Sequence, residues 1–553
     1  MVARPPICCL FEGRNRIKGG NEVKKRAISV AIVCALLIGL LAQCNFNNSG
    51  GDAQVNIIDD NYRNYYEIFV YSFCDSDGDK IGDLNGVTQK LDYIQEMGFN
   101  GIWFMPIMPS TTYHKYDVID YCDIDSQYGT IDDFKVLLDE CHKRGINVVI
   151  DFVMNHSSSQ NPWFLEACEY LKGLKEGEEA DASECEYVDY YNFSKEQVNS
   201  TYYKVYGSEY YYEGSFWEEM PDLNLKNPKL RKQFEDIAKF WIDLGVDGFR
   251  MDAAMHFEEG DVDTNNEILN WLYDYCLTLK PDFYMVSEVW ASEATIANYY
   301  GSKTPSMFNF DTSSAEGCLA RAAMGTYSAQ RLVETMVEYQ ETYSAQNPEY
   351  IDAPFLTNHD QVRIANNVQS VEENMKMAAG LLMMMNGSPF VYYGEEIGMQ
   401  SSGKEDENKR LPMRWSDENE DGMTNGPSGS KKDIEYKVEA LDKQLDDENS
   451  LLNYYKRALL LRNQNPEIAR GEIEIIEELT KDNQAVITKT YDGSEIAIVY
   501  NTDQSEISVD ISGTKLEGWD ICGMLTLLPT EEVSLDGNSI KMPAKSIVIL
   551  KAK

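Results

Sequence analysis

Three acidic residues follow short apolar segments of the kind that form buried strands. Asp252 ends the segment GVDGFRMD, Glu288 lies in FYMVSEVW, and Asp360 lies in FLTNHD. Two carboxylates placed across a glycosidic bond can hydrolyse it. One stays ionised as the nucleophile, and the other holds a proton for the departing oxygen. Glycoside hydrolysis is therefore the reaction that these residue types favour.

Basic and imidazole side chains accompany these acids. Arg250 precedes Asp252 by two residues and so lies on the same face of the strand, where its charge would keep the carboxylate ionised. The chain has only 5 histidines. Four of them lie in short motifs with carboxylates, namely His114, His156, His256 and His359. This grouping predicts one common site rather than scattered surface acids.

Apolar runs of strand length alternate with amphipathic helical stretches through most of the chain. EIFVYSF precedes the helix-like NGVTQKLDYIQEMG, and GIWFMPI precedes IDDFKVLLDECHKRG. Such alternation predicts parallel strands joined by helical crossovers. Eight strands are expected, near residues 66–71, 101–106, 146–153, 246–252, 283–289, 307–311, 353–357 and 388–392. Eight imply an α/β fold, a closed (β/α)8 TIM barrel whose C-terminal strand ends carry the acids.

Three segments depart from this alternation within or after the predicted barrel, which spans residues 64–465. Residues 157–224 are rich in Tyr, Glu and Asn and are too long for a simple crossover, so we expect a small domain B inserted after strand 3. Residues 399–445 are polar and typical of a loop. Residues 466–553 contain alternating strand patterns such as QAVITKTY and SEIAIVYN, which predict a C-terminal antiparallel β-sandwich.

The N-terminal segment has a different character. The tripeptide KKR precedes the apolar run AISVAIVCALLIGLLA, which is the layout of a secretory signal. Residues 1–44 are expected to comprise an N-terminal extension and then a segment, from Lys24 to Cys44, that resembles a bacterial lipoprotein leader with a lipid on Cys44. A polar tether follows over 45–63. Gln43 departs from the small residue usual before that cysteine, so an uncleaved anchor is the alternative. Either arrangement predicts an extracellular or cell-surface protein that contacts the membrane only through this segment or its lipid.

Composition restricts the possible partners. The 553 residues include 92 Asp and Glu against 49 Lys and Arg, a formal net charge of −43. Association with nucleic acid or an anionic membrane surface would begin with repulsion, whereas a neutral polysaccharide meets no such barrier.

The 12 cysteines show no paired spacing, so neither a disulfide framework nor a zinc site is indicated. Cys168 and Cys185 form either a disulfide or two buried thiols.

Taken together, the motifs resemble a known enzyme family. DFVMNH, GFRMDAAMH, SEVW and FLTNHD look like the four signature regions of the α-amylase family, glycoside hydrolase family 13. MPDLN resembles its fifth region and YYGEEIGM its eighth-strand motif, and the similarity runs from about Tyr65 to Trp415. The resemblance implies a retaining double displacement with Asp252 as nucleophile, Glu288 as acid/base and Asp360 as transition-state stabiliser.

The resemblance also implies substrate- and metal-binding residues. Those expected to contact the sugar are Tyr116, His114, His156, Arg250, His359 and Trp290. The loop DSDGDKIGDLNG has oxygen ligands at alternate positions, which suit a hard cation such as calcium, and it resembles a calcium loop of the family. Its ligands would be Asp75, Asp77, Asp79, Asp83 and the Ile81 carbonyl; an Asp/Gly-rich turn is the alternative. A second structural calcium site would join Asn155, Asp222 and the His256 carbonyl.

The expected function is an extracellular α-amylase that hydrolyses internal α-1,4-glucosidic bonds of starch and maltodextrins. SEVW and FLTNHD favour it over 1,6-acting oligosaccharidases. MPDLN, however, resembles the neopullulanase and cyclomaltodextrinase group, and Met255 replaces the Lys that amylases commonly have before His256. Neopullulanase, cyclomaltodextrinase or α-glucosidase-type activity is therefore the alternative, and a transglycosylase uses the same residues. A non-catalytic surface glucan-binding or transporter-associated subunit is a further alternative, against which the complete acid set argues.

Overall fold

A barrel of eight parallel strands carries the predicted site residues. The computed structural model describes residues 58–431, 434 and 437–552. Its largest sheet has the strand order β10-β9-β8-β7-β3-β2-β1-β11, and a parallel bridge from Phe355 to Phe390 joins the two edges. The strands are β1 (Tyr65–Ile68), β2 (Gly101–Phe104), β3 (Asn147–Phe152), β7 (Gly248–Met251), β8 (Tyr284–Ser287), β9 (Ser306–Asn309), β10 (Ala353–Pro354) and β11 (Phe390–Tyr392). The predicted (β/α)8 barrel is confirmed.

The first strand is shorter than the sequence predicts. It ends at Ile68, and Val70–Phe73 forms the short helix α2. The apolar run EIFVYSF is buried along nearly its whole length, so it has no alternating pattern that distinguishes a strand from a buried helical turn. The early turn directs the following residues, 74–83, into a loop at the C-terminal end of the barrel strand.

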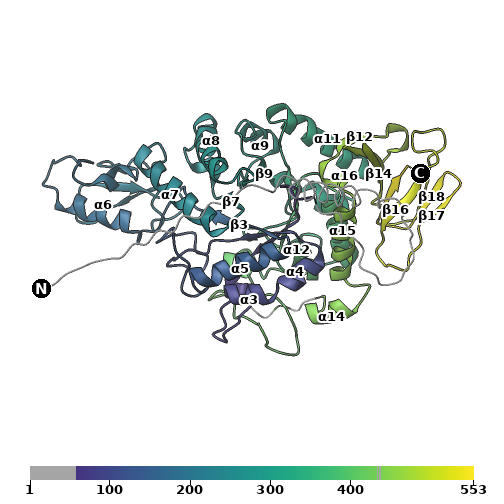
Figure 1. The fold of residues 1–553 in the computed structure, drawn as a ribbon, viewed down its shortest axis with the longest axis horizontal. Helices are drawn as coiled ribbons and strands as arrows, with labels where there is room; N and C mark the ends of the chain where they lie inside the picture. Colours follow the sequence, from purple (N-terminus) through teal and green to yellow (C-terminus); the bar gives the residue numbers. More distant parts are fainter. Residues whose placement is uncertain (1–57, 432–433, 435–436, 553) are drawn as a thin grey trace, which may run out of the picture. The chain divides into compact units, whose positions relative to one another are not determined.

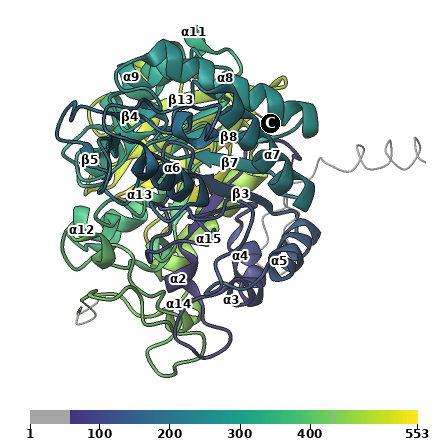
Figure 2. The same ribbon diagram turned by 90° about the vertical axis from the view of Figure 1, so that its left-hand side faces the viewer.

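Helices cover the outside of the barrel, and Figure 2 shows α5, α7, α8 and α9 around β3, β7 and β8. The major ones are α3 (Leu84–Gln89), α4 (Leu91–Met97), α5 (Ile131–Lys143), α7 (Pro228–Leu244), α8 (Val262–Leu279), α9 (Glu293–Tyr299), α11 (Ala329–Gln346), α13 (Glu372–Met383) and α15 (Leu451–Gln464). Their boundaries follow local sequence signals. A capping box of Thr130 and Asp133 starts α5, and Gly245, with φ of 114°, ends α7 in the left-handed conformation that glycine tolerates.

The segment after β3 contains its own small sheet. Helix α6 (Pro162–Gly173), at the left of Figure 1, is followed by β4 (Phe193–Ser194), β5 (Tyr202–Lys204) and β6 (Tyr211–Glu213). These strands pair in the antiparallel order β4-β6-β5. A bridge pairs His156 with Asp222, and the Leu223 amide donates to the Asn155 carbonyl at 2.9 Å. These bonds fix His156 at the edge of the barrel mouth. Cys168 and Cys185 are free, buried thiols.

The C-terminal part forms two antiparallel sheets, as the sequence predicts. Their strands are β12 (Glu472–Ile475), β13 (Gln484–Tyr491), β14 (Ser494–Asn501), β19 (Ser546–Lys551) and β16 (Asp520–Leu525), and then β15 (Ile507–Asp510), β18 (Ser539–Met542) and β17 (Ser534–Asp536). Apolar side chains such as Val486, Val499 and Ile540 fill the core that the two sheets share. Lys489 on β13 donates to the Met384 and Ile468 carbonyls, at 2.8 and 2.7 Å, and so ties this part to the barrel.

The predicted leader and lipid attachment at Cys44 lie outside the described residues, and they remain predictions. Within residues 58–552, so far as the structure describes them, no helix has both the length and the apolar composition of a membrane span.

Candidate active site

The two acids predicted to react lie side by side at the C-terminal ends of β7 and β8. The Glu288 amide donates to the Met251 carbonyl at 3.0 Å, and the Ala254 amide donates to the Glu288 carbonyl at 3.1 Å. The side chain of Glu288 accepts from the Ala253 amide at 3.0 Å. Ala253 has a φ of 50°, a left-handed conformation that is strained for a residue with a Cβ. The turn after Asp252 is therefore held in a costly shape that aims an amide at Glu288.

Arg250 links the acids. Its Nη1 lies 2.6 Å from Asp252 Oδ1 and 2.7 Å from Asp151 Oδ1, and its Nη2 lies 3.1 Å from Glu288 Oε1. Burial raises the pKa of Asp252, and the Arg250 guanidinium lowers it again in part. Burial also raises the pKa of Glu288. The Arg250 guanidinium lowers that pKa in part, and the nearby charge of Asp252 raises it. This arrangement favours an ionised Asp252 beside a Glu288 that can hold a proton.

The third acid, Asp360, lies between two cations. Its Oδ1 is 2.7 Å from Arg410 Nη2, and its Oδ2 is 3.0 Å from His359 Nε2. Burial disfavours the charge, but His359 and Arg410 outweigh it and hold the pKa of Asp360 well below its usual range. Asp360 is therefore a permanent anion that can accept hydrogen bonds from sugar hydroxyls.

Aromatic and imidazole groups also line the cleft that contains Asp360. The Tyr116 hydroxyl lies 3.1 Å from Asp151 Oδ2 and 2.8 Å from His359 Nε2, and its amide donates to His114 Nδ1 at 3.2 Å. His156 is buried, yet its Nε2 has no hydrogen-bond partner among the described residues. Burial lowers the pKa of His156 to about 4. A neutral imidazole with an unpaired nitrogen at the cleft is suited to a sugar hydroxyl.

The acids open into a cleft of about 550 Å³. Phe216, Trp217 and Met255 form an apolar wall of this cleft, and Trp290, which is 50% exposed, stacks on Phe310 at 4.9 Å. A second cavity of about 500 Å³ shares Trp290 and Asp360 with the first. The groove therefore continues past the catalytic candidates instead of ending at them.

The predicted site residues converge. Those that line the cleft are Asp252, Glu288, Asp360, Tyr116, His114, His156 and Trp290. Arg250 and His359 lie just beneath it, buried, and contact the acids directly. The geometry thus brings every residue predicted for catalysis or sugar binding into one region.

Several residues of the site did not emerge from the sequence. Arg410 comes from the polar segment after β11, and Phe216 and Trp217 come from the segment before MPDLN, where no pattern marks them. Glu67 lies beneath the cleft and contacts His359. A signal for Glu67 was present, because it is the one charged residue in the otherwise uncharged run EIFVYSF.

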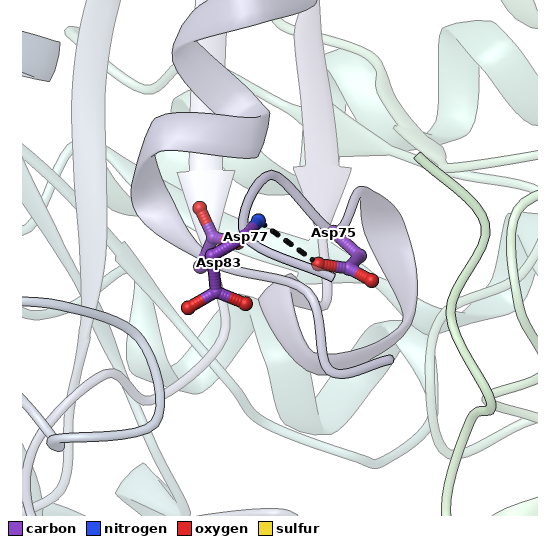
Figure 3. A group of neighbouring side chains, drawn as sticks. All are labelled: Asp75, Asp77 and Asp83. Atoms are coloured by element: carbon purple, nitrogen blue, oxygen red, sulfur yellow. Dashed lines mark hydrogen bonds between the residues drawn. The ribbon is translucent and has the colours of Figure 1, made fainter. Parts of the chain in front are cut away.

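The acidic loop after α2 brings part of the predicted metal set together. Carboxylate oxygens of Asp75, Asp77 and Asp83 lie within 4.8 Å of one another (Figure 3). Asp75 also accepts from the Asp77 and Gly78 amides, at 3.1 and 2.7 Å. Asp79 is not part of the group, and its Oδ1 accepts from the Ile81 amide at 2.7 Å. Three oxygen donors of this kind form a possible site for a hard cation.

The residues of the second predicted metal site surround a different cavity. Asn155, Asp222 and His256 line a space of about 620 Å³ between the inserted sheet and the barrel. Burial raises the pKa of Asp222 to about 6, and its two carboxylate oxygens accept from the Ser215 amide at 3.2 and 3.1 Å.

Comparison with known proteins places this geometry in context. A family model described as "Alpha amylase, catalytic domain" matches residues 67–471. Alpha-amylase 3 of Dictyoglomus thermophilum is 38% identical, over 80% of this chain and 86% of that protein. An oligo-1,6-glucosidase of Parageobacillus thermoglucosidasius is 29% identical, over 79% of this chain and 89% of that protein. The solved structure of Eubacterium rectale Amy13B superposes with a TM-score of 0.87 at 44% identity, and the match covers 90% of this chain and 97% of that one. The matched range contains every cleft residue described above.

Proposed function

The chain belongs to the alpha-amylase family of glycoside hydrolases, and we propose that it is an α-amylase that cleaves internal α-1,4-glucosidic bonds of starch and malto-oligosaccharides. The observation that carries the proposal is the groove that continues beyond the acids. An enzyme that removes single terminal sugars needs only a closed pocket, whereas an internal bond requires room for sugars on both sides. The wall of Phe216 and Trp217 and the ring of Trp290 provide apolar faces for such a chain.

In the first proposed step Asp252 attacks the anomeric carbon. A bond forms between that carbon and a carboxylate oxygen, while the bond to the glycosidic oxygen breaks and Glu288 gives its proton to that oxygen. Arg250 holds both carboxylates in place throughout. Asp360 accepts hydrogen bonds from the distorted sugar and stabilises the positive charge that develops at its ring.

In the second proposed step water releases the sugar. Glu288, now ionised, takes a proton from water as its oxygen attacks the anomeric carbon, and the bond to Asp252 breaks. Two displacements at one carbon give net retention of configuration. The contact of one guanidinium with both carboxylates supports this mechanism, because retaining enzymes keep the two carboxyl groups only about 5–5.5 Å apart.

The first test of the proposal is the product pattern. We expect soluble starch to lose iodine staining rapidly while mixed malto-oligosaccharides accumulate, with much slower action on pullulan and cyclodextrins. Chromatography of the products at early time points measures this. Panose as the main product from pullulan would instead indicate a neopullulanase, and glucose released from chain ends would indicate an α-glucosidase. Starch that is bound but not cleaved would contradict an enzyme of any of these kinds.

We also propose that the loop of Asp75, Asp77 and Asp83 binds calcium as a structural ion. The donor set fits a cation, because an ionised carboxylate has about four lone-pair sites. Asp75 uses three of these sites for the backbone amides of residues 77, 78 and 80, so one site is left for an ion. The loop also contacts the segment that follows β11, since the Asp75 amide donates to the Gly422 carbonyl at 3.1 Å. Asn155, Asp222 and the His256 carbonyl remain the proposed second site.

Removal of calcium is expected to lower the melting temperature. A ligand present at about 100 times its Kd that binds only the native state adds about 2.7 kcal/mol of stability, which is roughly 2 °C for a chain of this size. Calorimetry with EDTA, then with calcium restored, measures the shift. Asp77→Asn should weaken the response, whereas Asp536→Asn, at an exposed position on β17, should preserve it. A melting temperature indifferent to EDTA in wild type would contradict both metal sites.

A further inference from the structure

Glu67 on β1 lies beneath the cleft and contacts the imidazole of His359. The side chain of Glu67 is 1% exposed, and His359 is fully buried. Glu67 Oε1 lies 2.6 Å from His359 Nδ1. The other ring nitrogen, Nε2, lies 3.0 Å from Asp360 Oδ2. One imidazole therefore lies between two carboxylates that come from opposite parts of the chain.

With Glu67 and Asp360 ionised, the hydrogen-bond acceptors around this ring require a proton on each nitrogen. A carboxylate accepts, so Nδ1–H donates to Glu67 and Nε2–H donates to Asp360. The Tyr116 hydroxyl, 2.8 Å from Nε2, then accepts from that same N–H and donates its own proton to Asp151 Oδ2 at 3.1 Å. Every polar atom of the network is satisfied when His359 carries a positive charge.

Acidic groups around His359 balance this positive charge. Glu67 on β1 and the neighbouring Asp360 contact the ring directly. The Tyr116 hydroxyl, from the loop after β2, also contacts the ring, and Asp151 on β3 lies behind that hydroxyl. Arg250 and Arg410 add positive charge nearby, and Arg410 Nε donates to the His359 carbonyl at 3.3 Å. Burial alone would lower the pKa of His359, but Asp360 and Glu67 outweigh it and raise that pKa to about 9.

We propose that Glu67 is a positioning residue of the active site, which keeps His359 doubly protonated so that the ring stays fixed between Asp360 and Tyr116 while the enzyme works. The inference rests on the proposed function for its catalytic consequence, but the charge state of His359 is independent of it. Glu67 touches no substrate, and it acts through His359 on the anion that stabilises the sugar.

The direct test is a titration of the imidazoles by NMR. With only 5 histidines in the chain, selective isotope labelling of histidine, with His359→Gln to assign the signal, can resolve His359. In wild type without substrate, His359 should remain protonated through pH 8. In Glu67→Gln, which keeps the volume and a hydrogen-bond acceptor, its pKa should fall by about 1–3 units, since one adjacent charge is lost. A neutral His359 at pH 7 in wild type would overturn the proposal, whatever substrate the enzyme cleaves.

The kinetic test uses the pH profile of kcat/KM on a malto-oligosaccharide. The ratio of wild type to Glu67→Gln should grow about tenfold between pH 6 and pH 8, as His359 loses its proton in the variant. Glu67→Asp keeps the charge and should retain most of the wild-type pH profile even if activity falls. Glu396→Gln is the matched control, because it replaces another buried carboxylate of the barrel, one that contacts Tyr66 and Tyr93 rather than His359. A pH-independent loss in Glu67→Gln would indicate a merely structural role.

Discussion

Asp252→Asn is expected to lower kcat/KM on starch by about four orders of magnitude. The amide has nearly the shape of the carboxylate, so the fold and the pairing of Arg250 with Asp151 should persist. A neutral amide, however, cannot donate an electron pair to the anomeric carbon as readily, and it cannot form the ester through which retention proceeds. The loss should therefore appear mainly in kcat, with substrate binding little changed.

Trapping of the covalent intermediate is the sharper measurement for this variant. A fluorinated glycosyl fluoride slows the second step, so wild type should gain the mass of one sugar, and peptide mapping should locate it on Asp252. The variant should remain unlabelled. Asp247→Asn is the matched control, because Asp247 precedes the same strand at the other end of the barrel and bonds to His142 and Val148. If Asp252→Asn kept more than about 1% of wild-type activity, another residue would have to be the nucleophile.

The position of the acids could be predicted because it follows from short sequence patterns together with the predicted barrel. A strand of period 2 puts Arg250 and Asp252 on one face, and parallel strands bring their C-terminal ends to one mouth, so Glu288 must lie nearby. The structure adds the contacts that give these residues their charge states. Arg250 touches both Asp252 and Glu288, a relation that no spacing along the chain reveals.

Residues supplied by loops could not be predicted in this way. Arg410 reaches Asp360 from a polar segment whose path depends on contacts with α2, where the Ser72 hydroxyl donates to the Arg410 carbonyl at 2.7 Å. Trp217 is held at the cleft by a turn in which the Met220 amide donates to the Trp217 carbonyl at 2.9 Å. Such paths are set by tertiary packing, and local patterns carry little information about them.

The loop after β1 shows the same limit for the metal site. Alternating oxygen ligands predicted that Asp75, Asp77, Asp79 and Asp83 would act together. In the structure Asp79 closes its own turn with the Ile81 amide, while Asp83 caps α3 through the Gly86 amide at 2.7 Å. Short acidic side chains also bond to nearby backbone amides, so ligand spacing alone does not determine which of them group together.

The activity that Glu288→Gln loses is expected to depend on how much the leaving group of the substrate needs a proton. On maltotetraose, whose leaving group is a sugar alkoxide, kcat/KM should fall by about 10³–10⁴. On α-maltosyl fluoride, whose leaving group needs little protonation, the first step should fall much less. The amide cannot activate water, so the second step should become limiting, and added azide, which needs no general base, should restore turnover and yield an α-glycosyl azide.

The pH profile gives a second, independent signature of the same residue. Burial and the charge of Asp252 raise the pKa of Glu288 in wild type. Loss of its proton on going to higher pH should therefore lower kcat/KM on maltotetraose along an alkaline limb. That limb should flatten in Glu288→Gln, because the amide does not titrate in this range. Equal losses on the fluoride and on maltotetraose, with no rescue by azide, would show that Glu288 supports the site structurally and that a different group protonates the leaving oxygen.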